Sequence, residues 1–179
     1  FEWDNLAYVY AGAQKNMGIP GVSICIGNEK YLNSEDNSRY LNLGQLVEKN
    51  SLLNTPPTFS IYVLKLVTDW MIEMGGIKYF EEKSIRQSSR LYEQLQTYEK
   101  FLILPVTDYS KSRSNIIFKF LNEDLEKKFL IEAIEKGILG LNGHRSEGGI
   151  RISLYNSITD EMVDYLSEFM DKFFAGNGK

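Results

Sequence analysis

The order of strand-like and helix-like stretches after residue 100 constrains the fold most. Four short apolar runs have strand character, and they lie at 101–106, 115–121, 138–141 and 150–155. Two amphipathic stretches have helical spacing: one covers 125–136, and the other begins with Thr159 or Asp160 as its cap. The order strand, strand, helix, strand, strand, helix predicts a small α/β sandwich, in which helices cover one face of a mostly antiparallel sheet.

The first 76 residues predict two strands and two helices. Strands are expected at 6–10 and 21–27, and a short helix around 43–48. A longer helix is expected over 57–74, because its apolar residues recur with helical spacing, and the pair Gly75-Gly76 should end it. The apolar positions that share this face are Phe59, Val63, Leu66, Val67, Trp70 and Met74.

A second long helix is expected from about residue 77 to residue 98. Its inward positions should be Phe80, Ile85, Leu91 and Leu95, and its outward positions Glu81, Glu82, Lys83, Arg86 and Arg90. The charged positions are most simply a solvated face. We expect a domain boundary at the start of this helix, which divides the chain into 1–76 and 77–179.

Composition excludes several classes of protein. With 179 residues, 43% hydrophobic and 13% aromatic, the chain can bury one sizeable core. A net charge of −4 gives no electrostatic basis for binding nucleic acid, and no apolar run is long enough to span a membrane. No metal site is expected. The single cysteine, Cys25, lies in a strand-like run and should be a buried, inert thiol.

One lysine stands at the end of an apolar strand, in the run Tyr10-Ala-Gly-Ala-Gln-Lys15-Asn16. Small residues at the strand mouth can exclude water from the amine, and desolvation favours the neutral form, which is a nucleophile. A neutral amine is what a Schiff base with an aldehyde cofactor such as pyridoxal phosphate requires. The alternative is a solvated loop lysine without chemistry, and on the local pattern alone this alternative is better supported.

The run Asn54-Thr55-Pro56-Pro57-Thr58 stands directly before the predicted 57–74 helix. Thr55 suits the N-cap and Pro56 the first helical position. A helix N-terminus can bind an anion, but the prolines would remove two of its N–H donors. A phosphate bound here would therefore depend on Asn54 and Thr55. Judged in isolation, the run is better interpreted as a plain capped helix start.

The third segment joins the only histidine to two arginines across a Gly-Gly turn. His144 and Arg145 form a donor cluster suited to a dianion, and Arg151 alternates with Ile150 and Ile152 on a strand. An arginine fixed on a strand offers a rigid fork for one carboxylate. In the competing interpretation, Arg151 is a surface residue of an edge strand and His144 is a turn residue. The two interpretations are close to evenly balanced.

Together these segments resemble the phosphoserine aminotransferases, which are pyridoxal-phosphate-dependent enzymes with the aspartate-aminotransferase fold (fold type I). The resemblance covers essentially the whole chain, and its motifs occur in the same order. They are Ala-Gly-Ala-Gln-Lys-Asn at 11–16, Asn-Thr-Pro-Pro-Thr at 54–58, Glu-Lys-Lys-Phe at 126–129 and His-Arg-Ser-x-Gly-Gly-x-Arg-x-Ser-x-Tyr-Asn at 144–156. Several ungapped motifs in order are far more specific than any one of them.

The resemblance implies a role for each candidate residue. Lys15 would carry the cofactor as a Schiff base, and Gln14 would contact it. Asn54 and Thr55 would hold the cofactor phosphate of the neighbouring subunit in a homodimer with shared active sites. His144 and Arg145 would grip the substrate phosphate across the dimer, while Arg151 would grip the substrate carboxylate.

The implied reaction transfers an amino group from glutamate to 3-phosphohydroxypyruvate and gives phosphoserine, in the cytoplasm. The chain begins at Phe1 with the lysine motif close behind, so the resemblance implies the C-terminal half of such an enzyme, inactive by itself. The sequence before Phe1 decides whether a targeting peptide exists. The resemblance also implies a ring-binding aspartate and a ring-stacking aromatic residue, which Asp4 and Trp3 do not supply. The alternative function is a non-catalytic dimerising or anion-binding α/β domain.

Overall fold

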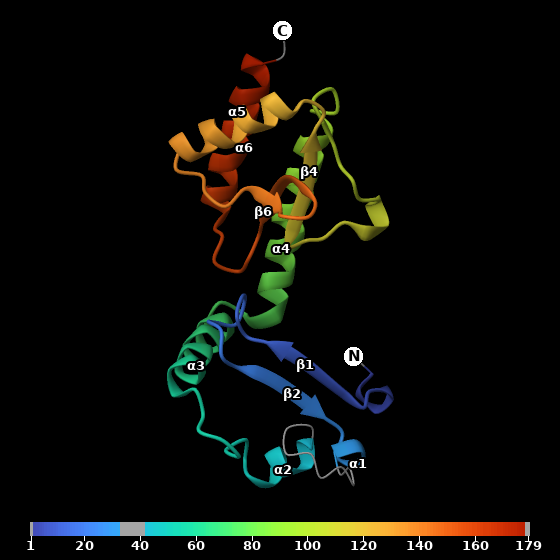
Figure 1. Ribbon diagram of the computed structural model, residues 1–179, viewed down its shortest axis with the longest axis vertical. Helices are drawn as coiled ribbons and strands as arrows, with labels where there is room; N and C mark the ends of the chain where they lie inside the picture. Colours follow the sequence, from blue (N-terminus) through green and yellow to red (C-terminus); the bar gives the residue numbers. More distant parts are fainter. Residues whose placement is uncertain (1, 33–41, 178–179) are drawn as a thin grey trace. The chain divides into compact units, whose positions relative to one another are not determined.

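The computed structural model describes residues 2–32 and 42–177, and the chain forms two compact units, 1–74 and 75–179 (Figure 1). The second unit begins at Gly75, whose φ of 113° lies in the left-handed region that favours glycine. This residue follows Met74, the C-cap of the last helix of the first unit. The expectation that Gly75-Gly76 ends that helix is therefore confirmed.

The first unit contains an antiparallel hairpin and short helices. Its strands are β1 (Tyr8–Gly12) and β2 (Ser23–Gly27), which pair from Tyr8 with Gly27 to Gly12 with Ser23. Each strand begins two residues later than the sequence predicts. The helical elements are η1 (Trp3–Asn5), α1 (Glu29–Leu32), α2 (Leu43–Glu48) and α3 (Thr58–Glu73). The predicted short helix at 43–48 is confirmed with both of its bounds.

Helix α3 starts later than its prolines suggest. Its N-cap is Pro57, without a side-chain capping hydrogen bond, and its first residue is Thr58. The prediction that Thr55 caps the helix and that Pro56 is its first residue is wrong, because both lie before the helical backbone. The prolines therefore take no N–H groups from the first turn, whose donors belong to Thr58 and the residues that follow it.

The apolar side chains of α3 are not covered by the first unit. None of its residues is buried, and Phe59 and Ile72 are 71% and 73% exposed. The predicted apolar residues from Phe59 to Trp70 do lie on a helix, but an apolar helix face needs a partner surface to become a core. Within the described residues, the elements of this unit do not provide that surface.

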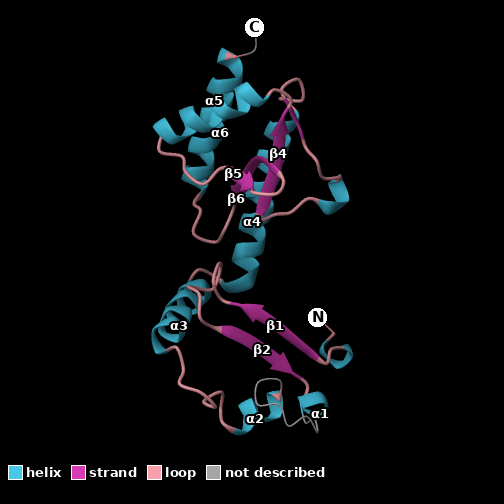
Figure 2. Ribbon diagram, in the orientation of Figure 1, coloured by secondary structure: helices cyan, strands magenta, loops and turns pink. Residues whose placement is uncertain are grey.

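The second unit is built around a four-stranded antiparallel sheet in the order β3-β4-β6-β5 (Figure 2). The strands are β3 (Leu102–Ile103), β4 (Asn115–Phe120), β5 (Asn142–His144) and β6 (Gly148–Ser153). The helical elements are α4 (Gly76–Gln96), η2 (Asp108–Ser110), α5 (Glu123–Glu135) and α6 (Asp160–Gly176). Thr159 caps α6 by accepting a hydrogen bond from the Met162 N–H, at 3.3 Å, which confirms the predicted start.

One face of this sheet carries the core. Burial alternates along β4, where Ile116, Phe118 and Phe120 are buried and the residues between them are less so. The buried face packs against residues from all three long helices, including Leu91 of α4 and Phe129 of α5. The sequence-based fold class, a small α/β sandwich with helices on one face of an antiparallel sheet, is confirmed.

Two predicted strands differ from the observed ones. The run 101–106 pairs only as β3 at Leu102–Ile103, and 138–141 is not a strand. Gly137 and Gly140 have φ values of 77° and 78°, so left-handed turns bracket the apolar residues between them. The strand that pairs with β6 in this region is β5, which begins at Asn142, directly after the predicted run.

Helix α4 also differs from its predicted pattern at two positions. Ile85 is 42% exposed rather than inward, and Lys83 is only 9% exposed rather than outward. The ammonium group of Lys83 donates a hydrogen bond to the carbonyl oxygen of Asn156, at 2.8 Å. A charged group can therefore occupy an inward position because a backbone acceptor lies opposite it.

Two features of the chain relate to its expected environment. Cys25 is exposed, so the prediction of a buried thiol is wrong: among the described residues β2 pairs only with β1, and none of them buries the cysteine. Among the helices of residues 2–32 and 42–177, none has the length and apolar character to cross a membrane.

Candidate functional site

Lys15 lies in the turn that follows β1. The preceding Ala13 is 1% exposed, and its N–H donates to the carbonyl oxygen of Val22, at 3.0 Å. The N–H of Lys15 donates in turn to the Ala13 carbonyl oxygen, at 2.7 Å. These bonds fix the backbone that presents the lysine. Gln14 and Lys15 are exposed, so residues 2–32 and 42–177 do not bury the Lys15 side chain as the small residues of the motif suggested.

The segment that joins β1 to β2, in which Lys15 lies, contacts the first turn of α3. The hydroxyl group of Ser60 donates a hydrogen bond to the carbonyl oxygen of Pro20, at 2.9 Å. Gly21 has a φ of 116°, and a Cβ atom at this position would lie 2.8 Å from the Ser60 Oγ. A side chain is therefore excluded here by backbone conformation and by space. The first unit thus brings the lysine turn and the helix start together.

Asn54 and Thr55 are exposed and line an open depression together with Leu52, Leu53 and Pro56. Their amide and hydroxyl groups are donors of the kind that holds a phosphate oxygen. The N–H groups at the start of α3 follow directly in sequence, and an anion is stabilised near such a helix end. The donors at Asn54 and Thr55 therefore fit a phosphate group, and Lys15 supplies an amine of the kind that an aldehyde cofactor requires.

The second unit presents His144 and Arg145 from the hairpin that joins β5 to β6. His144 pairs with Gly148, and both His144 and Arg145 are exposed. A Cβ atom on Gly143 would lie 1.9 Å from the Gly148 carbonyl oxygen, so this position admits only glycine. The close approach of the two strands keeps the loop short. His144 is the last residue of β5, and Arg145 is the first residue of the loop.

The ring of His144 is held by its own loop. Its Nδ1 lies 2.9 Å from the Ser146 Oγ, and the Ser146 N–H donates to the same nitrogen at 3.3 Å. The Ser146 hydroxyl also donates to the Glu147 carboxylate, at 3.2 Å. Nδ1 is therefore engaged by Ser146, and Nε2 is the ring nitrogen that can contact a ligand.

Arg151 occupies the sheet face opposite the core. It pairs with Ile117 of β4, while its neighbours Ile150 and Ile152 are buried on the other face, as the alternation predicts. Its Nε atom is buried and has no hydrogen-bond partner in the part of the chain that the structure describes. A buried donor without a partner costs free energy, so a ligand carboxylate that accepts from it would be bound favourably.

Sequence reasoning missed three side chains of the second unit that make specific contacts. Ser146 contacts His144, and Lys83 and Gln87 hold the segment that follows β6, but none of the three was predicted to have such a role. Ser146 lies inside the His-Arg-Ser motif, and its hydroxyl next to a histidine was a usable signal. For Lys83 and Gln87 the partners lie more than 70 residues further along the chain, at Asn156 and Ile158, so no local pattern could find them.

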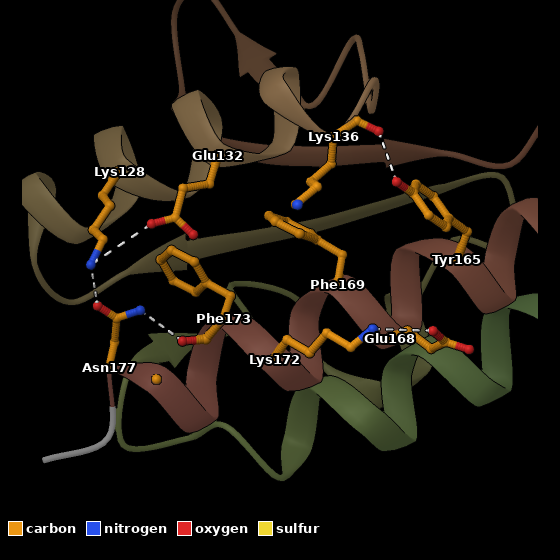
Figure 3. Close-up of a pocket in the computed structure, with 10 residues that line it drawn as sticks. Lys128, Glu132, Lys136, Tyr165, Glu168, Phe169, Lys172, Phe173 and Asn177 are labelled. Atoms are coloured by element: carbon orange, nitrogen blue, oxygen red, sulfur yellow. Dashed lines mark hydrogen bonds and ion pairs between the residues drawn. The ribbon is translucent and has the colours of Figure 1, made fainter.

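A groove between α5 and α6 holds none of the predicted site residues (Figure 3). Most of its charges are paired: Lys128 lies 3.8 Å from Glu132, and Lys172 lies 3.4 Å from Glu168. The hydroxyl group of Tyr165 donates to the Lys136 carbonyl oxygen at 2.9 Å. Solvated ion pairs of this kind contribute little to binding or stability. The groove is therefore a surface feature and not the candidate site.

The family described as aminotransferase class-V matches residues 5–166. The match includes the lysine turn, the start of α3, the His144–Arg145 loop and Arg151. The chain belongs to the class-V aminotransferases.

Several similar proteins are phosphoserine aminotransferases. A phosphoserine aminotransferase of Streptococcus agalactiae is 42% identical over 180 residues, which cover 99% of this chain and 49% of the relative. A solved phosphoserine aminotransferase, in a study of radiation damage to its Schiff base, matches with a TM-score of 0.92 and 35% identity over 98% of this chain and 49% of the other. The enzyme from Trichomonas vaginalis with bound PLP matches with a TM-score of 0.86 and 28% identity over 96% and 49%. The chain thus spans about half the length of the relatives it matches.

Proposed function

We propose that this chain is the lysine-bearing part of a phosphoserine transaminase of serine biosynthesis. The reaction moves an amino group from glutamate to 3-phosphohydroxypyruvate and gives phosphoserine. The names of the relatives support the substrate pair. One structural observation carries the proposal furthest: the buried Arg151 Nε has no hydrogen-bond partner among the described residues and can donate to a substrate carboxylate.

Residues of the first unit would hold the cofactor, pyridoxal 5'-phosphate. When bound, this cofactor supplies an aldehyde that attaches to amines and an electron sink for the bonds of the substrate Cα. Lys15 would provide the Nζ to which it attaches, with Gln14 beside it. Asn54 and Thr55 would donate hydrogen bonds to the phosphate of the cofactor in the second subunit of a homodimer. The Lys15 Nζ, when it is not attached to the cofactor, would take and return the proton of the substrate Cα.

Residues of the second unit would orient the substrate. His144 and Arg145 would donate to the phosphate group from the β5–β6 loop, and Arg151 would pair with the carboxylate. Fixing both ends of a small acid places its Cα for proton transfer. Glutamate carries a carboxylate in place of the phosphate, so the same cations can bind it as the amino donor.

The proposal extends to the domains and the assembly of the protein. Residues 1–76 would belong to a large cofactor-binding domain and residues 77–179 to a linking helix and a small C-terminal domain. Asn54, Thr55, His144 and Arg145 would serve the active site of a second subunit in a homodimer, which requires a two-fold interface. The uncovered apolar face of α3 supports burial of this region in a larger assembly, and the whole enzyme would act in the cytoplasm.

The experiment that tests the proposal compares two arginine variants in the complete enzyme that contains this sequence. Arg145→Ala should weaken a phosphorylated substrate far more than its unphosphorylated analogue, on the order of 2–5 kcal/mol, because a charged pair is left unmatched. Arg151→Ala should weaken both analogues alike, since both carry the carboxylate. Values of kcat/KM that show the reverse pattern would mean that the two roles are exchanged, and no effect of either variant would reject the site.

The exposure of Lys15 favours a second candidate function for the chain by itself: a non-catalytic dimerising or anion-binding domain. The two functions differ in their response to pyridoxal phosphate. A transaminase part that is complete enough to bind the cofactor develops a visible absorbance band when the aldehyde attaches to Lys15, and the Lys15→Ala variant does not. A protein of the second kind shows no band in either form.

A further inference from the structure

The hydrogen bonds around His144 assign a proton position that the proposed function leaves open. The Ser146 N–H donates to the Nδ1 of His144 at 3.3 Å, so in the neutral ring Nδ1 is an acceptor and the proton resides on Nε2. The Ser146 Oγ lies 2.9 Å from the same Nδ1 and can donate to it as well. The neutral tautomer with a proton on Nδ1 would set that proton against the Ser146 N–H.

The charged form of the ring is supported by the same serine. The imidazolium cannot accept from the Ser146 N–H, but its Nδ1–H can donate to the Ser146 Oγ, and the Ser146 hydroxyl can donate to the Glu147 carboxylate, which lies 3.2 Å away. A hydroxyl group both donates and accepts, so Ser146 matches either state of the ring by rotation of its proton. In both states Nε2 carries a proton and is the ring nitrogen not engaged by the loop.

We infer that Ser146 is a positioning residue that keeps the His144 Nε2–H as a hydrogen-bond donor in both charge states of the ring. The ligand that such a donor suits is a phosphate dianion, whose oxygens accept only. This inference rests on the proposed function for the identity of the ligand. The position of the proton depends only on contacts within the 144–147 loop. Ser146 acts through His144 and need not touch the substrate.

The backbone of this loop gives the serine its place. His144 pairs with Gly148 across the hairpin, and the Glu147 N–H donates to the His144 carbonyl oxygen at 3.0 Å. The turn closed by this bond brings the Ser146 N–H and Oγ to the same edge of the imidazole ring. Gly148 has a φ of 65°, which lets the chain re-enter the strand immediately after the turn.

The experiment uses the fact that His144 is the only histidine of the 179-residue chain, so its ring gives one set of nitrogen signals. In the ¹⁵N-labelled chain at about pH 8.5, where an ordinary imidazole is neutral, we expect one protonated nitrogen, Nε2, and one unprotonated nitrogen, Nδ1. Ser146→Ala keeps the backbone N–H donor and removes only the hydroxyl, so both nitrogen shifts should move part of the way toward the averaged values of a free imidazole. Ser89→Ala, which changes an exposed serine of α4, should leave them unchanged.

Inorganic phosphate then separates this inference from the proposed function. In the wild-type chain it should perturb the Nε2 signal more than the Nδ1 signal, and Ser146→Ala should weaken phosphate binding about 2–10-fold, the worth of one lost hydrogen bond. Nitrogen shifts that are identical in wild type and Ser146→Ala, or a wild-type ring protonated on Nδ1, would overturn the positioning role. A fixed Nε2–H that does not respond to phosphate would reject phosphate as its ligand and count against the proposed role of His144.

Discussion

The ammonium group of Lys83 donates a hydrogen bond to the carbonyl oxygen of Asn156, 2.8 Å away. This contact joins α4 to the turn that follows β6, the strand that carries Arg151. Gln87, one helical turn further along α4, donates to the Ile158 carbonyl oxygen at 3.2 Å and to the Asp160 carboxylate at 2.8 Å. The burial of Lys83 lowers the pKa of its amine, which shows that the contact is made at a desolvated position.

Replacement of Lys83 by methionine should destabilise the second unit. Methionine fills the volume of the lysine stem but leaves the Asn156 carbonyl oxygen without its donor, at an expected cost of about 1–2 kcal/mol in the free energy of unfolding. Urea denaturation followed by circular dichroism measures the change. Lys78→Met is the matched control, because Lys78 is exposed on the same helix. Equal stability of the two variants would show that the buried contact contributes nothing.

Asp160 should make the stability of the second unit depend on pH. The hydrogen bond from Gln87, and then the contact with Arg86, lower the pKa of Asp160 from its ordinary value of 3.8. The ionised carboxylate therefore stabilises the folded state above the unfolded pKa, and this contribution is lost as the pH falls through the lower, folded pKa. Wild type should be more stable than Asp160→Asn at pH 6, and the difference should shrink only as the pH is lowered below about 4, toward and past the folded pKa. A difference that stays constant from pH 6 down to about pH 2 would contradict the account.

The centre of the core should be the most sensitive position of the second unit. Phe129 is fully buried and its ring lies 5.0 to 5.2 Å from those of Phe120, Phe169 and Phe173. Phe129→Ala should lower the free energy of unfolding by about 3–5 kcal/mol, from lost burial and the cavity that remains. Ile131→Ala serves as the control, since Ile131 is 59% exposed on the same helix. Thermal unfolding that shows similar losses for the two variants would contradict the assigned core.

The sequence predicts those parts of the fold that depend on local patterns. The alternation around Ile116, Phe118 and Phe120 identifies β4 and its buried face, and the oxygen of Thr159 identifies the start of α6. Prediction fails where a distant partner decides. The inward turn of Lys83 depends on an acceptor 73 residues away, and the exposure of Cys25 depends on which strands flank β2.

The candidate site shows the same division. Motif order identifies Lys15, His144, Arg145 and Arg151, and the structure confirms that Arg151 lies on the face opposite the isoleucines. The environment of Lys15 could not be predicted from the small residues beside it, because exclusion of water depends on what covers the strand end. In this chain the side chain is exposed, so its desolvation requires a surface that its own unit does not supply.

The central claim is that Lys15 is the amine to which the cofactor attaches, and the most direct measurement locates that attachment. The complete enzyme that contains this sequence is mixed with pyridoxal phosphate, reduced with borohydride, digested and analysed by mass spectrometry. We expect the reduced cofactor on the peptide that contains Lys15, and we expect Lys15→Arg to lose both the adduct and turnover, because a guanidinium does not form this bond. An adduct on another lysine, or near-native turnover by Lys15→Arg, would contradict the claim.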